Sequence, residues 1–361
     1  MDNLLRVIQS VGYPVNANVR ITPALYFDEQ TLSATVGENR FFTSDTFGTF
    51  TRNKKFPISG NEINFIDSIA VRLMGTSALS LTSANMGLFT KTALQILVDG
   101  RERLKIPLIE CLSAPMGTAF GANTIVTLAQ NVGRTKKMRL PIIINSQANV
   151  EVKIITDADY SALGVVRVEL GGLLYTKLSN FNVNFVKPFE QLSYTIFDTA
   201  AVVAAGQTVN LFTTENKAQS LFSKIFPLSN SEAFDIENIE VAFPCSLGAA
   251  ASYQAVQALL KESVLKVNIN NVDFLELAGK DLVTALFQNS TANPFKMSDN
   301  VITVDTKQNI IDYAGITLPV AITLPAKAQV RVTLQQNAIA NISESAYINV
   351  MLKGTLQRLV Q

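Results

Sequence analysis

The prediction of the fold starts from the sequence Phe56-Pro-Ile-Ser-Gly-Asn-Glu-Ile-Asn-Phe-Ile-Asp-Ser-Ile-Ala-Val71, because a similar sequence occurs again later in the chain. The second copy reads Phe226-Pro-Leu-Ser-Asn-Ser-Glu-Ala-Phe-Asp-Ile-Glu-Asn-Ile-Glu-Val241. The Phe-Pro pair, one serine, one glutamate and several aliphatic residues keep their places, each 170 positions further on. A repeat of this kind predicts one structural unit that is present twice in the chain.

Five further pairs of segments follow in the same order in both halves. Their offset only grows, from 171 for the first pair to 182 for the last, which indicates short insertions in the loops of the second copy. The pairs are Leu94–Gly100 with Leu265–Asn271, Leu104–Ile106 with Leu275–Leu277, Leu140–Ile144 with Leu318–Ile322, Ala148–Ile154 with Ala328–Leu334, and Val166–Leu170 with Ile348–Leu352.

The repeated unit has the pattern of a β-sandwich. Val150–Ile154, Val166–Leu170 and Val330–Leu334 alternate apolar with polar residues, which places one face of each segment on a core. Asp99-Gly100 and Asn270-Asn271 separate paired runs, as hairpin turns do. About eight such runs in each copy predict an all-β chain of two tandem eight-stranded jelly-roll β-sandwiches. Short helices are expected in the loops, near residues 76–89, 157–163, 246–261 and 336–342.

The expected division of the chain has four parts. An N-terminal arm or helix covers residues 1–40, the first jelly roll 41–190, a connector 191–206 and the second jelly roll 207–361. In the arm, the four apolar residues Leu4, Leu5, Ile8 and Val11 fall on one face of a helix. Two interpretations stay open: the helix faces inward, toward a membrane or a neighbouring subunit, or it caps its own domain.

Composition narrows the possible functions. Of the 361 residues, 48% are hydrophobic and only 16% are charged, so we expect neighbouring subunits to cover much of the surface. The net charge of +1 gives no basic field for nucleic acid. Histidine is absent, which removes the commonest general base and metal ligand. Cys111 and Cys245 are expected to be reduced, as in a protein made in cytoplasm. No secretory signal and no membrane-spanning apolar run are predicted.

Four groups of polar residues are candidates for catalysis or for binding a ligand. Asp157 and Asp159 are an acidic pair after a strand, which more often caps a turn than binds a cation. The acidic groups 232–237 and 62–67 occupy matching places, which favours a shared structural role over glycoside hydrolysis. The basic run 134–139 either contacts phosphate or, more simply, forms a turn between strands. We therefore predict no catalytic residue, no metal ligand and no cofactor.

With its two fused jelly rolls, helices in corresponding loops, few charges and no catalytic set, the chain resembles the double jelly-roll major capsid proteins of tailless icosahedral viruses. Proteins of this family form the capsids of adenovirus-like viruses and of bacteriophages with an internal membrane. The resemblance covers residues 41–361 and rests on the duplicated architecture, since the family has no strict sequence motif. It implies a structural protein of the virion, and not an enzyme, that assembles in the host cytoplasm.

The resemblance also implies the partners. Three subunits with two similar units each form a homotrimer of nearly hexagonal outline, which tiles the facets of an icosahedral capsid. Neighbouring capsomers, a vertex (penton) protein and minor capsid proteins are the implied partners, with an internal membrane as a further candidate. The alternative is a tandem β-sandwich that binds carbohydrate or acts as a glycosidase, although the chain has no tryptophan for a sugar platform. A two-cupin metalloenzyme would need histidine ligands.

Overall fold

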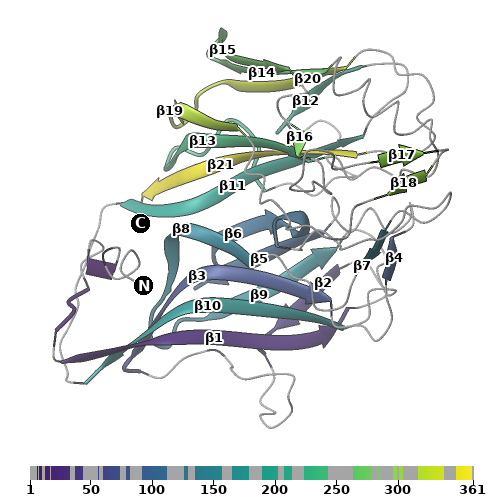
Figure 1. The fold of residues 1–361 in the computed structure, drawn as a ribbon. Helices are drawn as coiled ribbons and strands as arrows, with labels where there is room; N and C mark the ends of the chain where they lie inside the picture. Colours follow the sequence, from purple (N-terminus) through teal and green to yellow (C-terminus); the bar gives the residue numbers. More distant parts are fainter. Residues whose placement is uncertain are drawn as a thin grey trace.

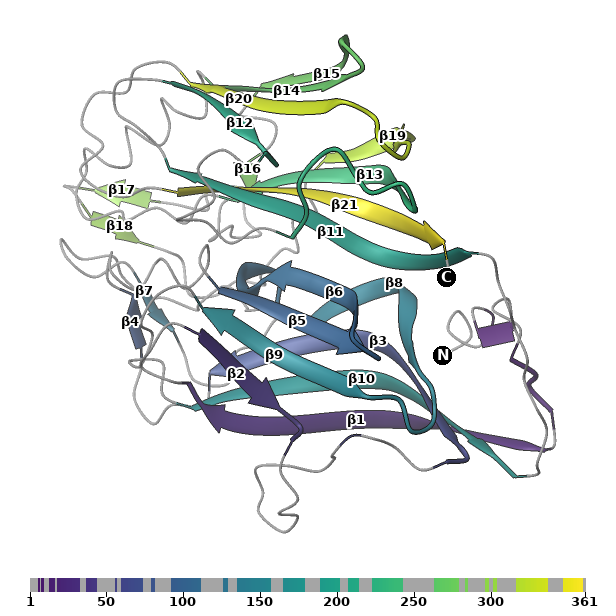
Figure 2. The same ribbon diagram turned by 180° about the vertical axis from the view of Figure 1, so that it is seen from behind.

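The fold is described from a computed structural model, and it is built almost entirely of strands (Figures 1 and 2). The residues that the structure describes are 6, 8–9, 13–16, 18–32, 37–43, 56, 60–73, 79–81, 92–111, 126–128, 135–156, 165–178, 189–201, 207–213, 223–242, 263–278, 283–284, 296–298, 301–303, 316–336 and 347–359.

The first half of the chain forms two four-stranded antiparallel sheets that face each other. Their strand orders are β1-β10-β3-β8 and β2-β9-β5-β6. The sheets enclose one core, to which nearly every strand contributes alternate side chains. The strands are β1 (Val19–Thr31), β2 (Gly37–Phe41), β3 (Glu62–Leu73), β5 (Thr92–Val98), β6 (Arg101–Pro107), β8 (Thr135–Ile144), β9 (Val150–Thr156) and β10 (Val165–Lys177).

The second half repeats this arrangement strand for strand. One sheet has the order β11-β21-β13 with β19 beside β13, and the other has the order β12-β20-β14-β15. Both halves are therefore eight-stranded jelly rolls, and the predicted fold class is confirmed. The strands are β11 (Phe189–Ala201), β12 (Gln207–Leu211), β13 (Glu232–Ala242), β14 (Ser263–Ile269), β15 (Val272–Ala278), β19 (Ile316–Leu324), β20 (Val330–Gln336) and β21 (Tyr347–Leu359).

A few short elements lie outside the two sandwiches. Two-stranded sheets are formed by β4 with β7 and by β17 with β18, and they lie on the same side of the molecule, away from the N-terminus (Figures 1 and 2). Strand β16 extends the sheet of β13. Their bounds are β4 (Leu79–Leu81), η1 (Leu108–Glu110), β7 (Val126–Leu128), β16 (Val283–Thr284), β17 (Lys296–Ser298) and β18 (Val301–Thr303).

The duplication extends to single hydrogen bonds. The buried carboxylate of Asp28 accepts a bond of 2.5 Å from the backbone N–H of Phe42, and that of Asp198 accepts one of 2.5 Å from Phe212. Both phenylalanines have a left-handed backbone, with φ of 61° and 59°. The ring of Phe42 packs against that of Phe56, with 5.7 Å between the ring centroids, and the ring of Phe212 packs against that of Phe226, with 5.6 Å between them. The repeated sequence thus leads into the equivalent strand of each unit, β3 in the first and β13 in the second.

Two glycines show the same close approach of backbones. Strands β3 and β13 each carry a bulge at the same place in their pairing with β10 and β21. A Cβ atom on Gly172 would lie 1.9 Å from the carbonyl oxygen of Phe65, and one on Gly354 would lie 1.8 Å from that of Asp235. Only glycine fits where the bulge brings the two strands together.

The strands differ from the prediction in four places. Each sandwich begins one strand earlier than expected, because β1 lies in the predicted arm and β11 mostly in the predicted connector. Both are edge strands, and exposed or polar residues on their outer faces weaken the alternation that predicts a strand. Two of the runs that were expected to be strands of the sandwiches, near residues 123–130 and 301–305, contain β7 and β18, which belong to the small sheets instead.

Two local expectations are also corrected. Residues 79–81 form strand β4, so the expected helix over 76–89 is wrong there. The expected helices near 157–163 and 246–261 lie outside the described residues, as does the one near 336–342 except for Gln336, which ends β20. The pairing of β3 with β8 and of β13 with β19 gives an offset of 180 between Ile144 and Leu324. The match of Leu140–Ile144 with Leu318–Ile322 was therefore two residues out of register, because the Leu-Pro pair in each is a coincidence.

Candidate functional site: the junction of the two units

The feature that joins the two jelly rolls is strand β11. It lies across the open edge of the first sandwich, where β8 ends one sheet and β6 ends the other, and it contacts both strands. Figures 1 and 2 show the result as a row, with β1 at one end, β8, β6 and β11 in the middle, and β15 at the other end. The second unit therefore closes an edge that the first unit leaves open.

The middle of this junction is apolar. Phe197 of β11 and Met351 of β21 are fully buried, and both belong to the hydrophobic core of the first unit although they come from the second. Burial of a side chain of this size contributes roughly 1.5–3 kcal/mol. Beside them, the backbone N–H of Leu140 donates a hydrogen bond of 2.8 Å to Oγ of Ser193. The two cores are thus partly shared.

A cluster of four charged residues crosses the junction. Glu110, which is 1% exposed, lies between Lys136 of its own unit and Lys353 of the second unit, with 2.8 Å between Lys353 Nζ and Glu110 Oε1. Lys353 also pairs with Glu240. Burial alone raises the pKa of the Glu110 carboxyl, but the two lysines outweigh this and bring the pKa well below its ordinary value. Burial likewise lowers the pKa of Lys353, and the two carboxylates raise it above the ordinary value.

A second polar group joins β6 of the first unit to β11 and β21 of the second. The hydroxyl of Tyr194 donates to a carboxylate oxygen of Glu102, and burial together with that carboxylate raises the pKa of Tyr194 well above its ordinary value. Arg358 donates to the carbonyl oxygen of Glu102 at 3.1 Å and to the carboxylate of Glu232 at 3.1 Å. Arg103 of β6 forms an ion pair with Glu190 of β11.

These contacts define one orientation of the two units. A buried charge that loses its partner is strongly destabilising, so any other alignment of β11 would leave several charges unpaired. The apolar contacts supply attraction, whereas the ion pairs and hydrogen bonds specify direction and register. The junction is therefore a specific join between two folded units and not a flexible linker.

The predicted inward-facing helix is placed in part. Arg6, Ile8 and Gln9 have helical backbone, and the side chain of Ile8 is fully buried. It packs with Ile63, Phe65, Leu173 and Tyr175 on the outer face of the first sheet. Ile8 therefore contacts its own domain, whereas Leu4, Leu5 and Val11 lie outside the described residues and their inward-facing role stays a prediction. Among the described helices, none has the length and hydrophobicity to cross a lipid bilayer.

The other polar groups from the sequence have structural partners. Glu232 pairs with Lys224 at 2.9 Å, and Asp235 accepts from Thr323 at 2.7 Å. Residues 135–139 of the basic run lie within strand β8 rather than in a turn, whereas Arg134 lies outside the described residues. Arg139 donates to Glu237 across the junction at 2.8 Å. Asp157 and Asp159 lie outside the described residues. In the described part of the chain, His, Cys, Asp and Glu residues form no group suited to a metal ion.

Sequence reasoning did not find the charged cluster. Glu110, Glu240 and Lys353 stand in three distant segments, and each sequence position looks like an ordinary surface charge. One available signal was the failure of the copies to match there, because the places of Glu240 and Lys353 are taken by Ala70 and Gly171 in the first copy. A charged residue that is present in one copy and absent from the equivalent place in the other indicates a role that only one copy has.

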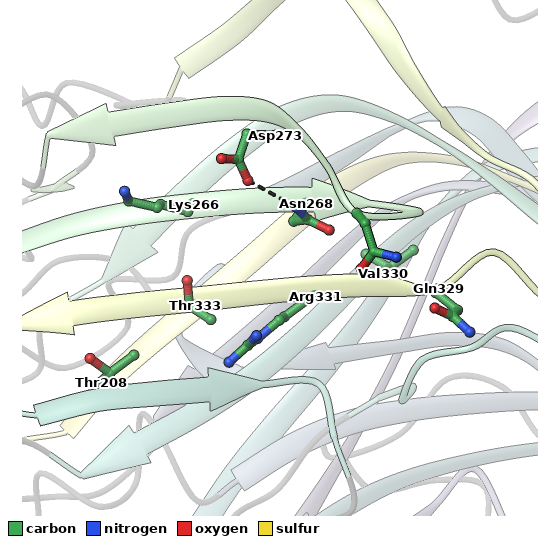
Figure 3. A pocket seen from close by; sticks show the side chains of 9 residues that line it. Thr208, Lys266, Asn268, Asp273, Gln329, Val330, Arg331 and Thr333 are labelled. Atoms are coloured by element: carbon green, nitrogen blue, oxygen red, sulfur yellow. Dashed lines mark hydrogen bonds between the residues drawn. The ribbon is translucent and has the colours of Figure 1, made fainter.

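A polar hollow lies on the outer face of the second unit, over β12, β20, β14 and β15. Its volume is about 440 Å³. Figure 3 shows Asn268 beside Asp273, where the amide of Asn268 donates a hydrogen bond of 2.9 Å to the carboxylate. Lys266 lies further along β14, and Arg331 lies on the neighbouring strand β20. The remaining lining residues are Thr208, Asn271, Gln329, Val330 and Thr333.

Comparisons with known proteins give distant likenesses in structure alone. No family model matches the sequence, and neither does any curated protein. The major capsid protein P2 from bacteriophage PM2 is 9% identical with a TM-score of 0.35, over 94% of this chain and 98% of its own. The STIV MCP is 10% identical with a TM-score of 0.37, over 91% and 96%. A peptide-N(4)-(N-acetyl-β-D-glucosaminyl) asparagine amidase is 12% identical with a TM-score of 0.29, over 94% and 100%.

Proposed function

We propose that this chain is the major capsid protein of a tailless icosahedral virus, and that three copies form one pseudo-hexagonal building block of the shell. The observation that carries the proposal is the buried, specific junction between two copies of one unit. A chain that repeats a jelly roll and then fixes the two repeats side by side supplies two equivalent wedges in a set orientation. Three such chains supply six.

The symmetry of the trimer explains why one chain needs only two copies of the unit to build a ring of six. A ring of six similar wedges tiles a flat facet with hexagonal symmetry, while the threefold symmetry of a trimer leaves two kinds of wedge that differ in their surfaces. Those differences allow neighbouring building blocks to be distinguished. A sequence with 16% charged residues suits a protein whose sides are covered by copies of itself.

The finer roles follow from the same proposal. The protein is a structural component of the virion and assembles in the host cytoplasm, and its partners are adjacent trimers, a vertex protein and minor capsid proteins. The N-terminal residues Leu4, Leu5 and Val11 are the candidates to face an internal membrane, since Ile8 packs on its own sheet. Catalysis and specific binding of nucleic acid are not part of this role.

The test is the mass of the purified protein in solution, followed by electron microscopy. Size-exclusion chromatography with light scattering is expected to give three times the chain mass of 39.3 kDa. Images of the concentrated protein should show particles of hexagonal outline or sheets and shells of them. A chain that stays monomeric at every concentration and forms no ordered assembly contradicts the proposal.

One observation favours a second function, carbohydrate binding. The hollow on the second unit presents amide, carboxylate, hydroxyl and guanidinium groups, and these groups match the hydroxyls of a sugar. Phe274, which is 54% exposed on the neighbouring strand β15, offers one aromatic face. A glycan array with the monomeric or trimeric protein tests this function, and substitution of Asp273→Ala should abolish any binding that is found.

A further inference from the structure

The junction inside the chain serves as a template for a contact between chains. In each unit, one edge of the sandwich is made by the first strand, β1 or β11, and the opposite edge by a pair of strands, β8 with β6 or β19 with β15. Inside the chain, β11 fills the β8–β6 edge. Among the strands that the structure describes, none packs in this way against the equivalent pieces, β1 at one end of the row and the β19–β15 edge at the other (Figures 1 and 2).

These two edges at the ends of the row carry exposed hydrophobic side chains. Val320 on β19 is 79% exposed, and Val272 and Phe274 on β15 are 58% and 54% exposed. On β1, Leu25 is 57% exposed and lies next to the exposed Pro23. Hydrophobic residues gathered on the matching strands of an internal interface indicate a surface that is covered in the working protein.

The strand registers show which residues correspond. The pairing of β5 with β6 skips Arg103, and the pairing of β14 with β15 skips Phe274, so each is the extra residue of the same bulge. Phe189 and Leu359 pair at the start of β11 as Val19 and Lys177 do at the start of β1.

The ion pair of the junction therefore has a counterpart. Arg103 of β6 binds Glu190 of β11 inside the chain. Phe274 takes the position of Arg103, and Arg20, which is exposed, takes that of Glu190. A guanidinium against the face of a phenyl ring is a favourable cation–π pair, and Asp273 next to the ring adds a negative charge. The two edges at the ends of the row thus carry chemically complementary side chains at corresponding positions.

We propose that the β19–β15 edge of one copy receives strand β1 of another copy, with Phe274 against Arg20 and Val320 against Pro23 and Leu25. The inference rests on the proposed function and names the surfaces through which its trimer forms. It also predicts a difference between the two kinds of contact. Gly171 and Ala70 stand where the junction has Lys353 and Glu240, so the contact between copies lacks the buried charged cluster. Copies therefore separate at dilutions at which each chain stays folded.

A charge exchange tests the pairing. Phe274→Arg places two guanidinium groups together, and the concentration at which the assembly half dissociates is expected to rise by about tenfold or more, because like charges across an interface repel. Adding Arg20→Glu rebuilds at this contact the ion pair that the chain already uses at its junction, and is expected to restore assembly. Leu359→Arg is the matched control, since Leu359 is 53% exposed at the end of β21, a strand that belongs to neither of these edges. Dissociation is followed by light scattering on dilution.

Cysteine crosslinking gives a second readout that needs no change in affinity. Phe274→Cys and Arg20→Cys in one chain lie at opposite ends of the row, so any disulfide between them joins two copies. Oxidation should give covalent species of two and three chains on a gel without reductant, and none with either single variant. Continuation of the ladder beyond three contradicts a closed trimer.

The outcomes separate the inference from the function on which it rests. A wild-type protein that never assembles overturns the proposed function and with it the inference. A wild-type trimer that Phe274→Arg leaves unchanged, or that Arg20→Glu fails to restore, overturns the inference alone. The thermal unfolding of both variants should match that of the wild type, and restoration by the second substitution excludes misfolding as the cause of any loss.

Discussion

Lys353 in the second unit lies with its Nζ atom 2.8 Å from Oε1 of Glu110 in the first, and these side chains are only 17% and 1% exposed. No loop or linker is needed to explain why two jelly rolls of one chain hold a single orientation, because a charge buried at their boundary has its partner on the other side. The energetic weight of that pair is the first quantity to measure.

Glu110→Gln should destabilise the protein markedly. Removing one partner from a buried ion pair leaves the other charge uncompensated and typically costs about 3–5 kcal/mol, and here Lys136 and Lys353 both lose a partner. Urea denaturation measures the free energy of unfolding. Glu276→Gln is the control, because its pair with Lys266 is largely exposed and is expected to change stability by less than about 1 kcal/mol. Equal effects of the two variants would mean that the Glu110 cluster carries no special weight.

The difference in unfolding free energy between the wild type and Glu110→Gln should depend on pH, with a sign that follows from the pKa of Glu110. The pKa of Glu110 in the folded chain lies below its ordinary value, despite burial, because of Lys136 and Lys353. A carboxyl with a depressed folded pKa contributes stability above its unfolded pKa of about 4.3, and this contribution is lost as the pH falls toward the folded pKa. The difference in unfolding free energy between wild type and Glu110→Gln should therefore be full at pH 7 and shrink steadily below about pH 4. A difference that grows on acidification would contradict this.

The duplication predicts equal effects of matched substitutions. Asp28→Ala and Asp198→Ala each leave a buried backbone N–H, of Phe42 and Phe212, without its acceptor. An unsatisfied buried donor costs about 1–3 kcal/mol, so each variant should lose stability in that range. Asp→Asn at either position keeps an acceptor oxygen and should cost less. A large effect in one unit and none in the other would show that the two carboxylates do different work.

How far the sequence leads is clear from these residues. The strands that alternate cleanly and repeat, such as β9 with β20, were predicted, because repetition and period both report on the core. The edge strands β1 and β11 were not, since one face of each is polar or lies against another unit. The cluster around Glu110 was not predicted either, because its members come together only through the tertiary fold.

Two glycines should be intolerant of any side chain. Gly172→Ala and Gly354→Ala each place a Cβ atom within 1.9 Å of a carbonyl oxygen on the neighbouring strand, and backbone has no room to move away inside a sheet. Both variants are expected to lose about 3 kcal/mol or more, or to remain insoluble, as overpacking of backbone against backbone costs more than overpacking of side chains. Gly60→Ala is the control, with its nearest atom at 3.7 Å on a side chain. Thermal unfolding midpoints measure the difference.

The N-terminal residues offer the last test, because Ile8 is buried on a sheet that belongs to its own unit. Ile8→Asp places a charge among Phe65, Leu173 and Tyr175 and should release the segment from that face. The exposed apolar patch should then bind a hydrophobic dye, and cleavage by a protease before β1 should become faster. Arg6→Asp is the control for added negative charge, since Arg6 is exposed. If Ile8→Asp neither binds dye nor is cleaved faster, the segment does not cover the sheet. If the released variant still forms trimers but fails to form particles, the N-terminal segment acts in assembly beyond the trimer.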